Sequence, residues 1–357
     1  MRAPSDQLRV LFVTNGLAYG GAERIVEALA LDLKAAGDEV AVVATTRGGP
    51  VAENLNRHGI RVHILGIRNP LDARVVWRLA RVMRKFQPDI VHSHLAVADI
   101  TTAMARPAVR ARFVTTVHNP GVELDLLKKT LWMAALKNFD RVLPVGEHVR
   151  RSLGPLEQAR VIRPSLVDLD AAVWTKARAR QLLGIPEDVP LALGVGRLSR
   201  VKGFDVLASS LKHLRTKNVR VAVIGEGPEA DALRASPIAL LGGKDEAAEL
   251  LAAADVVVSP SRSEGFPQVP LQAMAASRAL VATRVGGTPE VIVDGATGIL
   301  VEPEAPTLLA NAIDAVLEDP GLAGELGRAG RQRLIDAELT RAAMVRATRA
   351  AYLALLG

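Results

Sequence analysis

Short apolar runs, each followed by a segment of helical periodicity, recur along the first half of the chain. Residues 8–14 (LRVLFVT) have the continuous apolar character of a buried strand. Residues 22–36 carry apolar side chains at helical spacing, and Gly37 supplies a stop. Further strands are expected at 39–45, 61–67, 89–95, 112–118 and 141–146. Strands that alternate with helices indicate a parallel sheet with helices on both faces.

The pattern restarts in the second half, after a polar, proline-containing joint near residues 163–188. Strands are expected within 191–197, 220–227, 239–243, 255–261, 279–287 and 297–302. The chain therefore predicts an α/β protein with two doubly wound domains, 1–166 and 167–338. The last helix, about 339–357, is expected to pack back on the first domain. Ligands of such sheets bind at the carboxyl ends of the strands.

Composition narrows the class of protein. The chain has no cysteine, which excludes a disulfide framework, a thiolate metal site and a cysteine nucleophile. The first ten residues lack the apolar core of a signal peptide, and no apolar run approaches the roughly 18 residues of a membrane-spanning helix. We therefore expect a cytoplasmic protein.

The net charge of +7 is unevenly placed along the chain. Residues 1–173 hold 24 Lys and Arg against 17 Asp and Glu, whereas residues 174–357 hold 21 of each. A basic surface without function would give this pattern, and so would attraction to an anionic membrane or acceptor. No basic patch is interleaved with aromatic residues, so nucleic acid is not expected. Two candidate basic stretches are Trp77 with Arg78, Arg81, Arg84 and Lys85, and Lys128–Lys129 with Leu131–Trp132 and Lys137.

The first candidate site is the segment GVGRLSRVKGFDVL in the second half. Arg197 follows a buried strand, and Lys202 lies on the short loop before a helix expected to begin near Phe204. Two cations at the mouth of a sheet can neutralise a diphosphate, although two ordinary surface cations would look the same.

A second candidate is the segment SPSRSEGFPQVPLQAMA, residues 259–275. Its loop carries one acid, Glu264, and a helix is expected to begin near Gln268–Val269. Amide groups at a helix start bind phosphate and sugar oxygens, and Pro270 fits the first turn. Glu264 can accept hydrogen bonds from sugar hydroxyls, although a lone glutamate is more often an exposed loop residue.

The signals in the first half are weaker. Residues 14–24 form a strand, glycine loop and helix, a geometry that lets backbone approach phosphate, but they match no dinucleotide or Walker fingerprint. His118 ends a strand and faces the predicted ligand edge. Of His92 and His94, one is expected in the core and the other on the acceptor side.

The chain offers no Asp-x-Asp after a strand and no histidine cluster with metal-ligand spacing. We therefore expect no metal and no cofactor other than a co-substrate, with Arg197 and Lys202 in the place of a cation. A Ser-His-Asp arrangement or nucleophile elbow is also lacking.

Seven segments in order resemble the retaining glycosyltransferases of family 4, and the resemblance covers nearly the whole chain. They are YGGAER, PDIVHSH, TTVH, GRLSRVKGFDVL, GEGPE, LAAADVVVSPSRSEGFPQV and GGTPEVIVDGATGILV. The family has the GT-B fold. The resemblance thus implies two Rossmann-like doubly wound parallel-sheet domains with an interdomain cleft, the acceptor mainly on the first and the donor mainly on the second.

The same resemblance implies roles for individual residues. Arg197 and Lys202 would bind the donor diphosphate, Glu264 the donor sugar, and His118 the sugar or its phosphate. We take these four as the catalytic set. The further donor-binding positions implied are Gly20 and Gly21 near the phosphates, Phe266, Gln268 and Val269 on sugar and phosphate, Lys244 near the base, and Gln272.

Several positions depart from the family pattern. Gln272 stands where a second glutamate commonly holds the ribose, which puts donor affinity or nucleotide preference in doubt. Ser165–Leu166 replaces the usual Asn-Gly of the interdomain segment. Ser277 and Ala279 stand where glycine and proline are common.

We therefore expect transfer of a hexose-type sugar from a nucleoside-diphosphate sugar to a hydroxyl acceptor with retention, in cell-envelope or other glycan synthesis. The acceptor would be a glycan, a lipid-linked molecule or a small molecule. Double displacement through Glu264 and same-face attack assisted by the leaving phosphate both remain open. The rivals are a sugar-nucleotide 2-epimerase, a catalytically silent binding partner of the same fold and, less favoured, a dinucleotide dehydrogenase.

Overall fold

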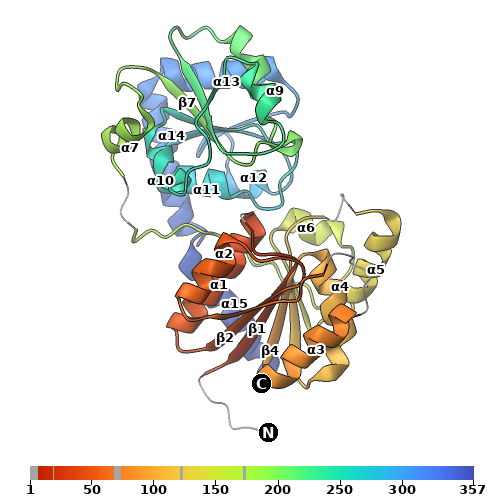
Figure 1. Cartoon of the computed structure of the whole chain (residues 1–357). Helices are drawn as coiled ribbons and strands as arrows, with labels where there is room; N and C mark the ends of the chain where they lie inside the picture. Colours follow the sequence, from red (N-terminus) through yellow and green to blue (C-terminus); the bar gives the residue numbers. More distant parts are fainter. Residues whose placement is uncertain (1–6, 19, 68–73, 121–123, 172–173) are drawn as a thin grey trace. The chain divides into compact units, whose positions relative to one another are not determined.

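The computed structural model describes residues 7–18, 20–67, 74–120, 124–171 and 174–357. The chain divides into two compact units (Figure 1). The first unit comprises Met1–Leu166 and Arg341–Gly357, and the second comprises Val167–Thr340. The chain thus leaves the first unit after Leu166 and returns to it two residues later than the predicted 339.

A six-stranded parallel sheet forms the centre of the first unit, in the order β3-β2-β1-β4-β5-β6. Each strand is where the apolar runs predicted it, although all six are shorter by one to three residues. In register, Thr14 lies opposite His94, which lies opposite Thr116. The strands are β1 (Arg9–Thr14), β2 (Glu39–Ala44), β3 (Arg61–Ile64), β4 (Ile90–His94), β5 (Arg112–Val117) and β6 (Arg141–Pro144).

Helices cover both faces of this sheet (Figure 1). One layer contains α1 (Gly21–Ala35), α2 (Pro50–Arg57) and α15 (Arg341–Leu356), and the other contains α3 (Arg74–Phe86), α4 (Ala96–Ala105) and α5 (Leu126–Leu136). The 3-10 turn η1 (Arg106–Ala108) and the short helix α6 (Glu147–Ser152) complete the unit.

The last helix, α15, is part of the first unit. Its Tyr352 is fully buried in the apolar core of the unit. Arg341 binds Asp32 with a bidentate ion pair at 2.8 and 2.5 Å, and Arg349 pairs with Asp38 at 3.2 Å. A buried aromatic ring and two charged contacts therefore attach the end of the chain to α1 and the segment that follows it.

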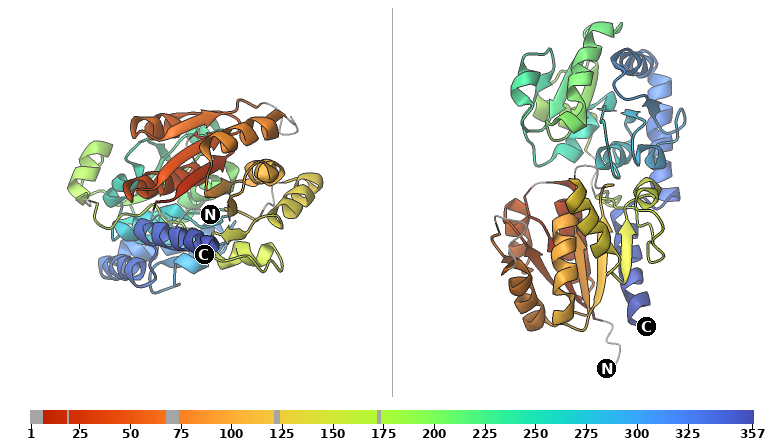
Figure 2. Two further views of the ribbon diagram at one scale, coloured as in Figure 1. Left: turned by 90° about the horizontal axis from the view of Figure 1, so that it is seen from below. Right: turned by 90° about the vertical axis from the view of Figure 1, so that its right-hand side faces the viewer.

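The second unit, coloured from green to blue in Figure 2, repeats the topology. Its strand order is β12-β11-β10-β7-β8-β9. Counted from its first strand, this is the same order as in the first unit. The strands are β7 (Leu191–Val195), β8 (Arg220–Ile224), β9 (Ala239–Leu240), β10 (Val256–Ser259), β11 (Ala279–Thr283) and β12 (Ile299–Val301).

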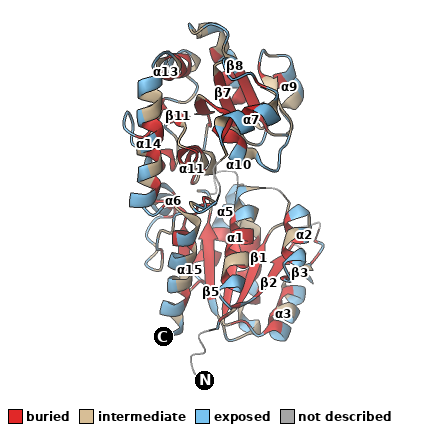
Figure 3. Ribbon diagram, turned by 90° about the vertical axis from the view of Figure 1, so that its left-hand side faces the viewer, coloured by how far each residue is buried: buried red, intermediate tan, exposed pale blue. Residues whose placement is uncertain are grey.

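The helices of the second unit also form two layers. One contains α8 (Phe204–Ser210), α9 (Ala230–Arg234) and α13 (Pro306–Glu318), and the other contains α7 (Lys176–Leu183), α10 (Ala247–Leu250), α11 (Gln268–Ala275) and α14 (Pro320–Asp336). The remaining turns are η2 (Arg200–Lys202), η3 (Leu211–His213), η4 (Leu251–Ala253) and α12 (Thr288–Val291). In both units the buried residues concentrate on the strands (Figure 3).

Helix α7 lies within the segment that the sequence analysis treated only as a polar joint. Its start is capped by Thr175, whose hydroxyl accepts from the amide of Arg178, and it ends at Gly184 in the left-handed region. The expectation failed because α7 buries little apolar surface. Its buried side chains are the small Ala179 and Arg180. Arg180 binds the carbonyls of Ala253 and Pro186 and the carboxylate of Asp255.

Candidate active site

The strand order of the second unit reverses between β7 and β10, and this is where the predicted donor residues gather. Ligands of open parallel sheets bind at this switch point, outside the carboxyl ends of the strands. Arg197 follows β7 by two residues, and Lys202 ends η2 just beyond it. Glu264 lies on the loop that follows β10. The structure therefore brings all three predicted side chains to one edge of the sheet.

Lys202 and Glu264 form a half-buried ion pair. Lys202 Nζ lies 2.7 Å from Glu264 Oε1, and the glutamate side chain is only 12% exposed. The hydroxyl of Ser261 donates to the same oxygen at 2.7 Å. Among the described residues, no donor reaches Oε2. One carboxylate oxygen is thus held by protein groups, while the other can accept from a ligand.

Ser261 is a site residue that the sequence analysis missed. It is 2% exposed, and its carbonyl accepts a hydrogen bond from Thr283 Oγ1. Spacing offered only a weak signal, because Ser259, Ser261 and Ser263 are equivalent in sequence terms. Only the fold shows that Ser261 alone turns its hydroxyl to Glu264.

Arg262 fastens the same loop from the outside. Its guanidinium pairs with Asp205 at 2.7 Å through both carboxylate oxygens, pairs with Glu304, and donates to the carbonyl of Arg200. The hydrogen bonds that Arg262 donates to Asp205, and then those it donates to Glu304, raise the pKa of Arg262 above its usual value. This clamp joins the loop that carries Glu264 to the turn that carries Lys202.

Glycines set how closely the loops of this edge approach one another. A Cβ on Gly286, whose φ is +51°, would lie 1.8 Å from the carbonyl oxygen of Glu264. On Gly203 (φ +67°) it would lie 2.0 Å from the carbonyl oxygen of Pro260. At both positions the left-handed backbone and the close crossing require glycine. The segment GGTPE contributed only to the family resemblance, and its sequence predicts no role for Gly286.

Helix α11 begins beside this edge, with Pro267 at the N-cap position and no side-chain cap. Gln268 and Gln272 are one turn apart on the half-buried side of the helix, and Val269 is also half-buried. Phe266 is 8% exposed, so it contributes packing and backbone rather than an open side chain. Gln272 thus occupies the helix face that leads to the edge.

The two remaining predicted site residues of the second unit, Arg197 and Lys244, are exposed. Arg197 is exposed, and its side chain has no hydrogen-bond partner among the described residues. Lys244 is exposed on the loop between β9 and α10, next to Gly243, whose amide donates to Glu226 Oε1 at 3.3 Å. Neither cation is held in place by a protein acid, so both are available to an anion.

Three histidines line the centre of the first sheet. His94 Nδ1 and the half-buried His118 Nε2 lie 2.9 Å apart, and the rings of His92 and His94 have centroids 4.4 Å apart. His92 also contacts Tyr352 Oη and lies 2.8 Å from Thr116 Oγ1. His118 is therefore in place at the carboxyl edge, and His94 supports it.

The expectation that His92 and His94 point to different sides was wrong. Residues two apart on a strand point to the same face, and both side chains are fully buried. Burial lowers the pKa of His92 to about 3 and that of His118 to about 4. It also lowers the pKa of His94 well below its usual range. The three rings are thus neutral at pH 7.

The glycine loop of the first unit leads into α1 as predicted. Gly20 is the N-cap residue of α1 and Gly21 its first residue. A Cβ on Gly20 would lie 2.2 Å from Glu23 Oε2, which is a movable side-chain atom, and a Cβ on Gly21 would meet nothing within 4 Å. The fold alone therefore does not require glycine at position 21.

Trp132 is not on the basic surface that the sequence analysis assigned to it. It is 2% exposed, and its Nε1 donates to Asp99 Oδ2 at 2.7 Å. Ser93 and Thr115 donate to the other oxygen of Asp99. Burial raises the pKa of Asp99 to about 6, against the lowering effect of these three hydrogen bonds. Trp132 faces inward because packing in the core, rather than the nearby lysines, decides the side on which it lies.

The family-pattern departures have structural correlates. Ser277 has φ +53°, a left-handed conformation that explains why glycine is common there. Ala279 begins β11 and is 2% exposed. Ser165 is fully buried, and Leu166 packs on the core of the first unit.

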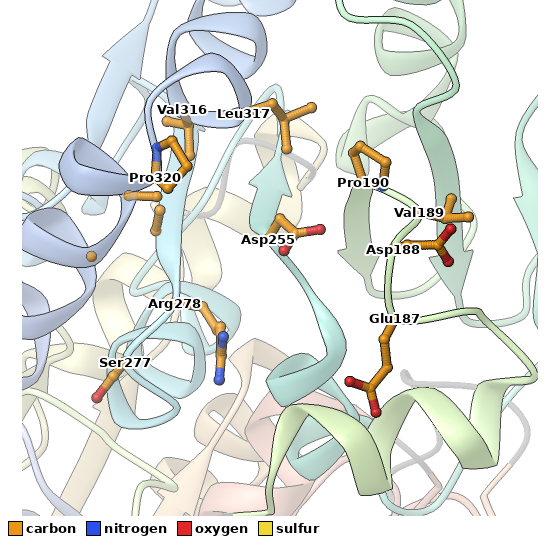
Figure 4. Close-up of a pocket in the computed structure, with 13 residues that line it drawn as sticks. Glu187, Asp188, Val189, Pro190, Asp255, Ser277, Arg278, Val316, Leu317 and Pro320 are labelled. Carbon is orange, nitrogen blue, oxygen red and sulfur yellow. The ribbon is translucent and has the colours of Figure 1, made fainter.

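A groove of about 370 Å³ lies at the opposite, amino edge of the second sheet (Figure 4). Its lining includes Glu187, Asp255 and Arg278, which precede β7, β10 and β11. Asp255 is occupied by Lys176, Arg180 and the amide of Leu191. None of the predicted donor residues lines this groove, so it is separate from the candidate site.

Two absences apply to the part of the chain that the structure describes. No helix there is long and apolar enough to cross a membrane. No group of three or more histidines, aspartates and glutamates there could hold a metal ion.

Known families cover most of this chain. The family described as "Glycosyltransferase Family 4" matches residues 19–167, and the one described as "Glycosyl transferases group 1" matches residues 175–333. D-inositol 3-phosphate glycosyltransferase of Arthrobacter sp. (strain FB24) is 30% identical, over 87% of this chain and 85% of that protein. N-acetyl-alpha-D-glucosaminyl L-malate synthase of Bacillus anthracis is 26% identical, over 89% and 90%.

Solved structures show the same fold. Anabaena Alr3699/HepE in complex with UDP-glucose aligns with a TM-score of 0.85 at 20% identity, over 96% of this chain and 100% of that one. Sucrose-phosphate synthase from Thermosynechococcus elongatus aligns with a TM-score of 0.83 at 22% identity, over 98% and 99%. With two parallel six-stranded sheets of one topology and these relatives, the chain belongs to the family 4 glycosyltransferases of GT-B fold.

Proposed function

We propose that this glycosyltransferase moves a hexose-type sugar from a nucleoside-diphosphate sugar to a hydroxyl acceptor, with retention and without a metal ion. The observation that carries the proposal is the Lys202–Glu264 pair at the switch point of the second sheet, with exposed Arg197 beside it. A cation suits the diphosphate of a nucleotide sugar, and a carboxylate with one oxygen left to accept hydrogen bonds suits the sugar. The relative solved with UDP-glucose supports a nucleotide-sugar donor.

In the proposed reaction the bond between the anomeric carbon and the diphosphate breaks as the acceptor oxygen bonds to that carbon. Negative charge grows on the leaving diphosphate, and Lys202 and Arg197 stabilise it. The acceptor hydroxyl gives its proton to a leaving phosphate oxygen. His118, neutral at pH 7, contacts the sugar or its phosphate by hydrogen bonding rather than by charge.

Same-face attack is favoured over double displacement by the contacts of Glu264. A nucleophilic carboxylate must share electrons with the anomeric carbon. Here Lys202 and Ser261 both donate hydrogen bonds to Oε1, and these contacts draw electron density from the carboxylate and weaken it as a nucleophile. We therefore assign Glu264 to the donor hydroxyls, with Oε2 as the accepting atom.

The first test is a thermal-shift screen of the protein with UDP-, GDP-, ADP- and dTDP-sugars, each with Mg²⁺ and with EDTA. A ligand that binds only the folded state raises Tm. We expect one nucleotide class to do so equally well in EDTA, and Lys202→Ala to remove the shift. No shift with any nucleotide would instead support the silent binding partner.

The second candidate function is epimerisation of the nucleotide sugar, because it needs the same diphosphate site. Incubation of the donor without acceptor, followed by chromatography of the sugar, separates the two. Formation of an epimer would contradict transfer, while unchanged donor agrees with it.

We further propose a cytoplasmic enzyme of cell-envelope or other glycan synthesis that contacts the inner face of an anionic membrane. The first unit holds 27 Lys and Arg against 15 Asp and Glu, a net charge of +12, and the second holds 18 against 23. Because the net positive charge is confined to one unit, it favours attraction of that unit to anionic lipid. Co-sedimentation with anionic vesicles at low salt tests it, and failure to sediment would favour a soluble acceptor.

A further inference from the structure

Exposed apolar side chains gather on one helix layer of the first unit, formed by α3, α4 and α5. Trp77 on α3 and Met104 on α4 are each 60% exposed. Leu126, Leu127 and Leu131 on α5 are 82%, 66% and 42% exposed. Elsewhere in the described part of this unit, the large apolar side chains exposed to this degree are Ile64, Leu353 and Leu356.

The same layer carries positive charge without exposed acids on its helices. Neither α3 nor α5 contains an aspartate or glutamate, and the one acid of α4, Asp99, is fully buried. The exposed cations of the two outer helices include Arg78, Arg81, Arg84, Lys85, Lys128 and Lys129. Asp125, at the start of α5, pairs with Lys128 at 2.6 Å and offsets one of them.

The second half of helix α5 packs against the unit, and its first half is exposed to solvent. Trp132, Ala135 and Leu136 are buried, and Trp132 is tied to Asp99. Residues 126–131 are exposed throughout. Asp125 caps the helix by accepting from the amide of Lys128, so the exposed part stays helical. A capped, exposed turn with three leucines and two lysines has the composition of an interfacial element.

The exposed first part of α5 lies at the same edge of the sheet as His118. A helix that follows a strand of a parallel sheet begins at the carboxyl edge of the sheet. β5 ends at Val117, directly before His118, and α5 begins at Leu126. Trp77 is likewise in the first turn of α3, after β3. Trp77 and the exposed leucines of α5 therefore lie toward the same edge as His118, whereas Met104, near the end of α4, lies toward the amino edge.

We propose that the α3–α5 layer docks on an anionic lipid bilayer, with Leu126, Leu127 and Leu131 entering the interface beside the cations of α3. Because the docking turn shares its edge with His118, the acceptor hydroxyl is carried by a molecule anchored in that bilayer. The docking surface deepens the proposed membrane contact, and the acceptor class rests on the proposed transferase function.

Docking is tested by sedimentation of the full chain with phosphatidylcholine vesicles that contain or lack phosphatidylglycerol. We expect binding only with the anionic lipid. Leu126→Ser with Leu127→Ser should weaken it at least tenfold or so, because two inserted side chains are lost. Arg81→Ser with Lys85→Ser should weaken it about tenfold or more at low salt and little at high salt.

The matched control is Leu182→Ser with Leu308→Ser, which changes two exposed leucines of the second unit, 59% and 48% exposed. This variant should bind vesicles as the wild type does. Since all these positions are exposed, circular dichroism and Tm should be unchanged in every variant. Equal binding by the α5 variant and the control would overturn the docking surface, and no binding by the wild type would overturn membrane contact altogether.

The acceptor class is tested with a radiolabelled nucleotide sugar that binds in the thermal-shift screen. The enzyme is incubated with the membrane fraction or the soluble fraction of cells that produce it. We expect label to enter the organic phase only with membranes, and the α5 double variant to slow this step. Label confined to water-soluble products would overturn the lipid-anchored acceptor while leaving the transferase function intact.

Discussion

The two units share one strand order, but different kinds of residues form the carboxyl edges of their sheets. In the second unit, loops cross closely at glycines, and Lys202 forms an ion pair with Glu264. In the first unit the edge is made of packed, neutral histidine rings. The second edge therefore offers charged groups, whereas the histidines of the first edge are neutral. The positive charge of the first unit lies instead on its outer helices.

The largest effect should come from removing the cation of the second edge. Lys202→Ala should lower kcat by about 10²- to 10³-fold, because the growing charge on the diphosphate loses its fixed partner. Steady-state kinetics with the identified donor measure this. Lys217→Ala, which removes an exposed lysine of the same unit, should leave kcat unchanged. Equal loss in both variants would show that general charge, rather than the edge, matters.

Glycines should matter for stability in the second edge but not in the first. Gly286→Ala should lower the free energy of unfolding by about 3 kcal/mol, because the new Cβ meets the carbonyl of Glu264 and φ is left-handed. Gly21→Ala meets nothing and replaces glycine in a helix, so it should raise stability by roughly 0.5 kcal/mol. Urea unfolding measures both, and similar values for the two would contradict the distinction.

Acid should destabilise the first unit before the second. Between pH 6.5 and about 4, His92, His94 and His118 are protonated in the unfolded chain but neutral in the fold, so stability falls as pH falls. Asp99 acts in the opposite sense, since its pKa of about 6 lets the folded state bind a proton there. The net difference of about two protons should cost about 2.5 kcal/mol for each pH unit between 6 and 4.

The fluorescence of Trp132 in the first unit and Trp174 in the second can follow this acid sensitivity in single-tryptophan variants. The second unit contains one histidine, His213, which is half-buried. The urea midpoint for unfolding of the second unit should therefore move less between pH 7 and 5. A larger shift for Trp174 than for Trp132 would contradict the assignment of acid sensitivity to the histidine stack.

The smallest effect concerns a departure from the family pattern. Ser277→Gly should raise the free energy of unfolding by up to about 1 kcal/mol, because Ser277 has left-handed backbone. Ser209→Gly, at an exposed position of α8, should lower it by about 0.5 kcal/mol. Thermal and urea unfolding measure both changes. Loss of stability in Ser277→Gly would show that its side chain outweighs the backbone strain.

The sequence alone was enough to predict the sheets, their parallel strands and the positions of Arg197, Lys202 and Glu264. Buried parallel strands are continuous apolar runs, so their place along the chain needs no tertiary information. Site residues follow the carboxyl ends of such strands, so they are read from the same pattern. Helix α7 was missed, because its buried face is held by Arg180 rather than by an apolar stripe.

Other features depended on which chain segments meet in space. Ser261 differs from Ser259 and Ser263 only by its hydrogen bond to Glu264, and Gly286 is required only because the loop of Glu264 crosses it. The inward turn of Trp132 and the shared face of His92 and His94 depend on the packing of helices and strands. Sequence thus determined the strands and the charges at their ends, since these are local properties. The tertiary structure decided their partners and exposure, because those depend on residues distant along the chain.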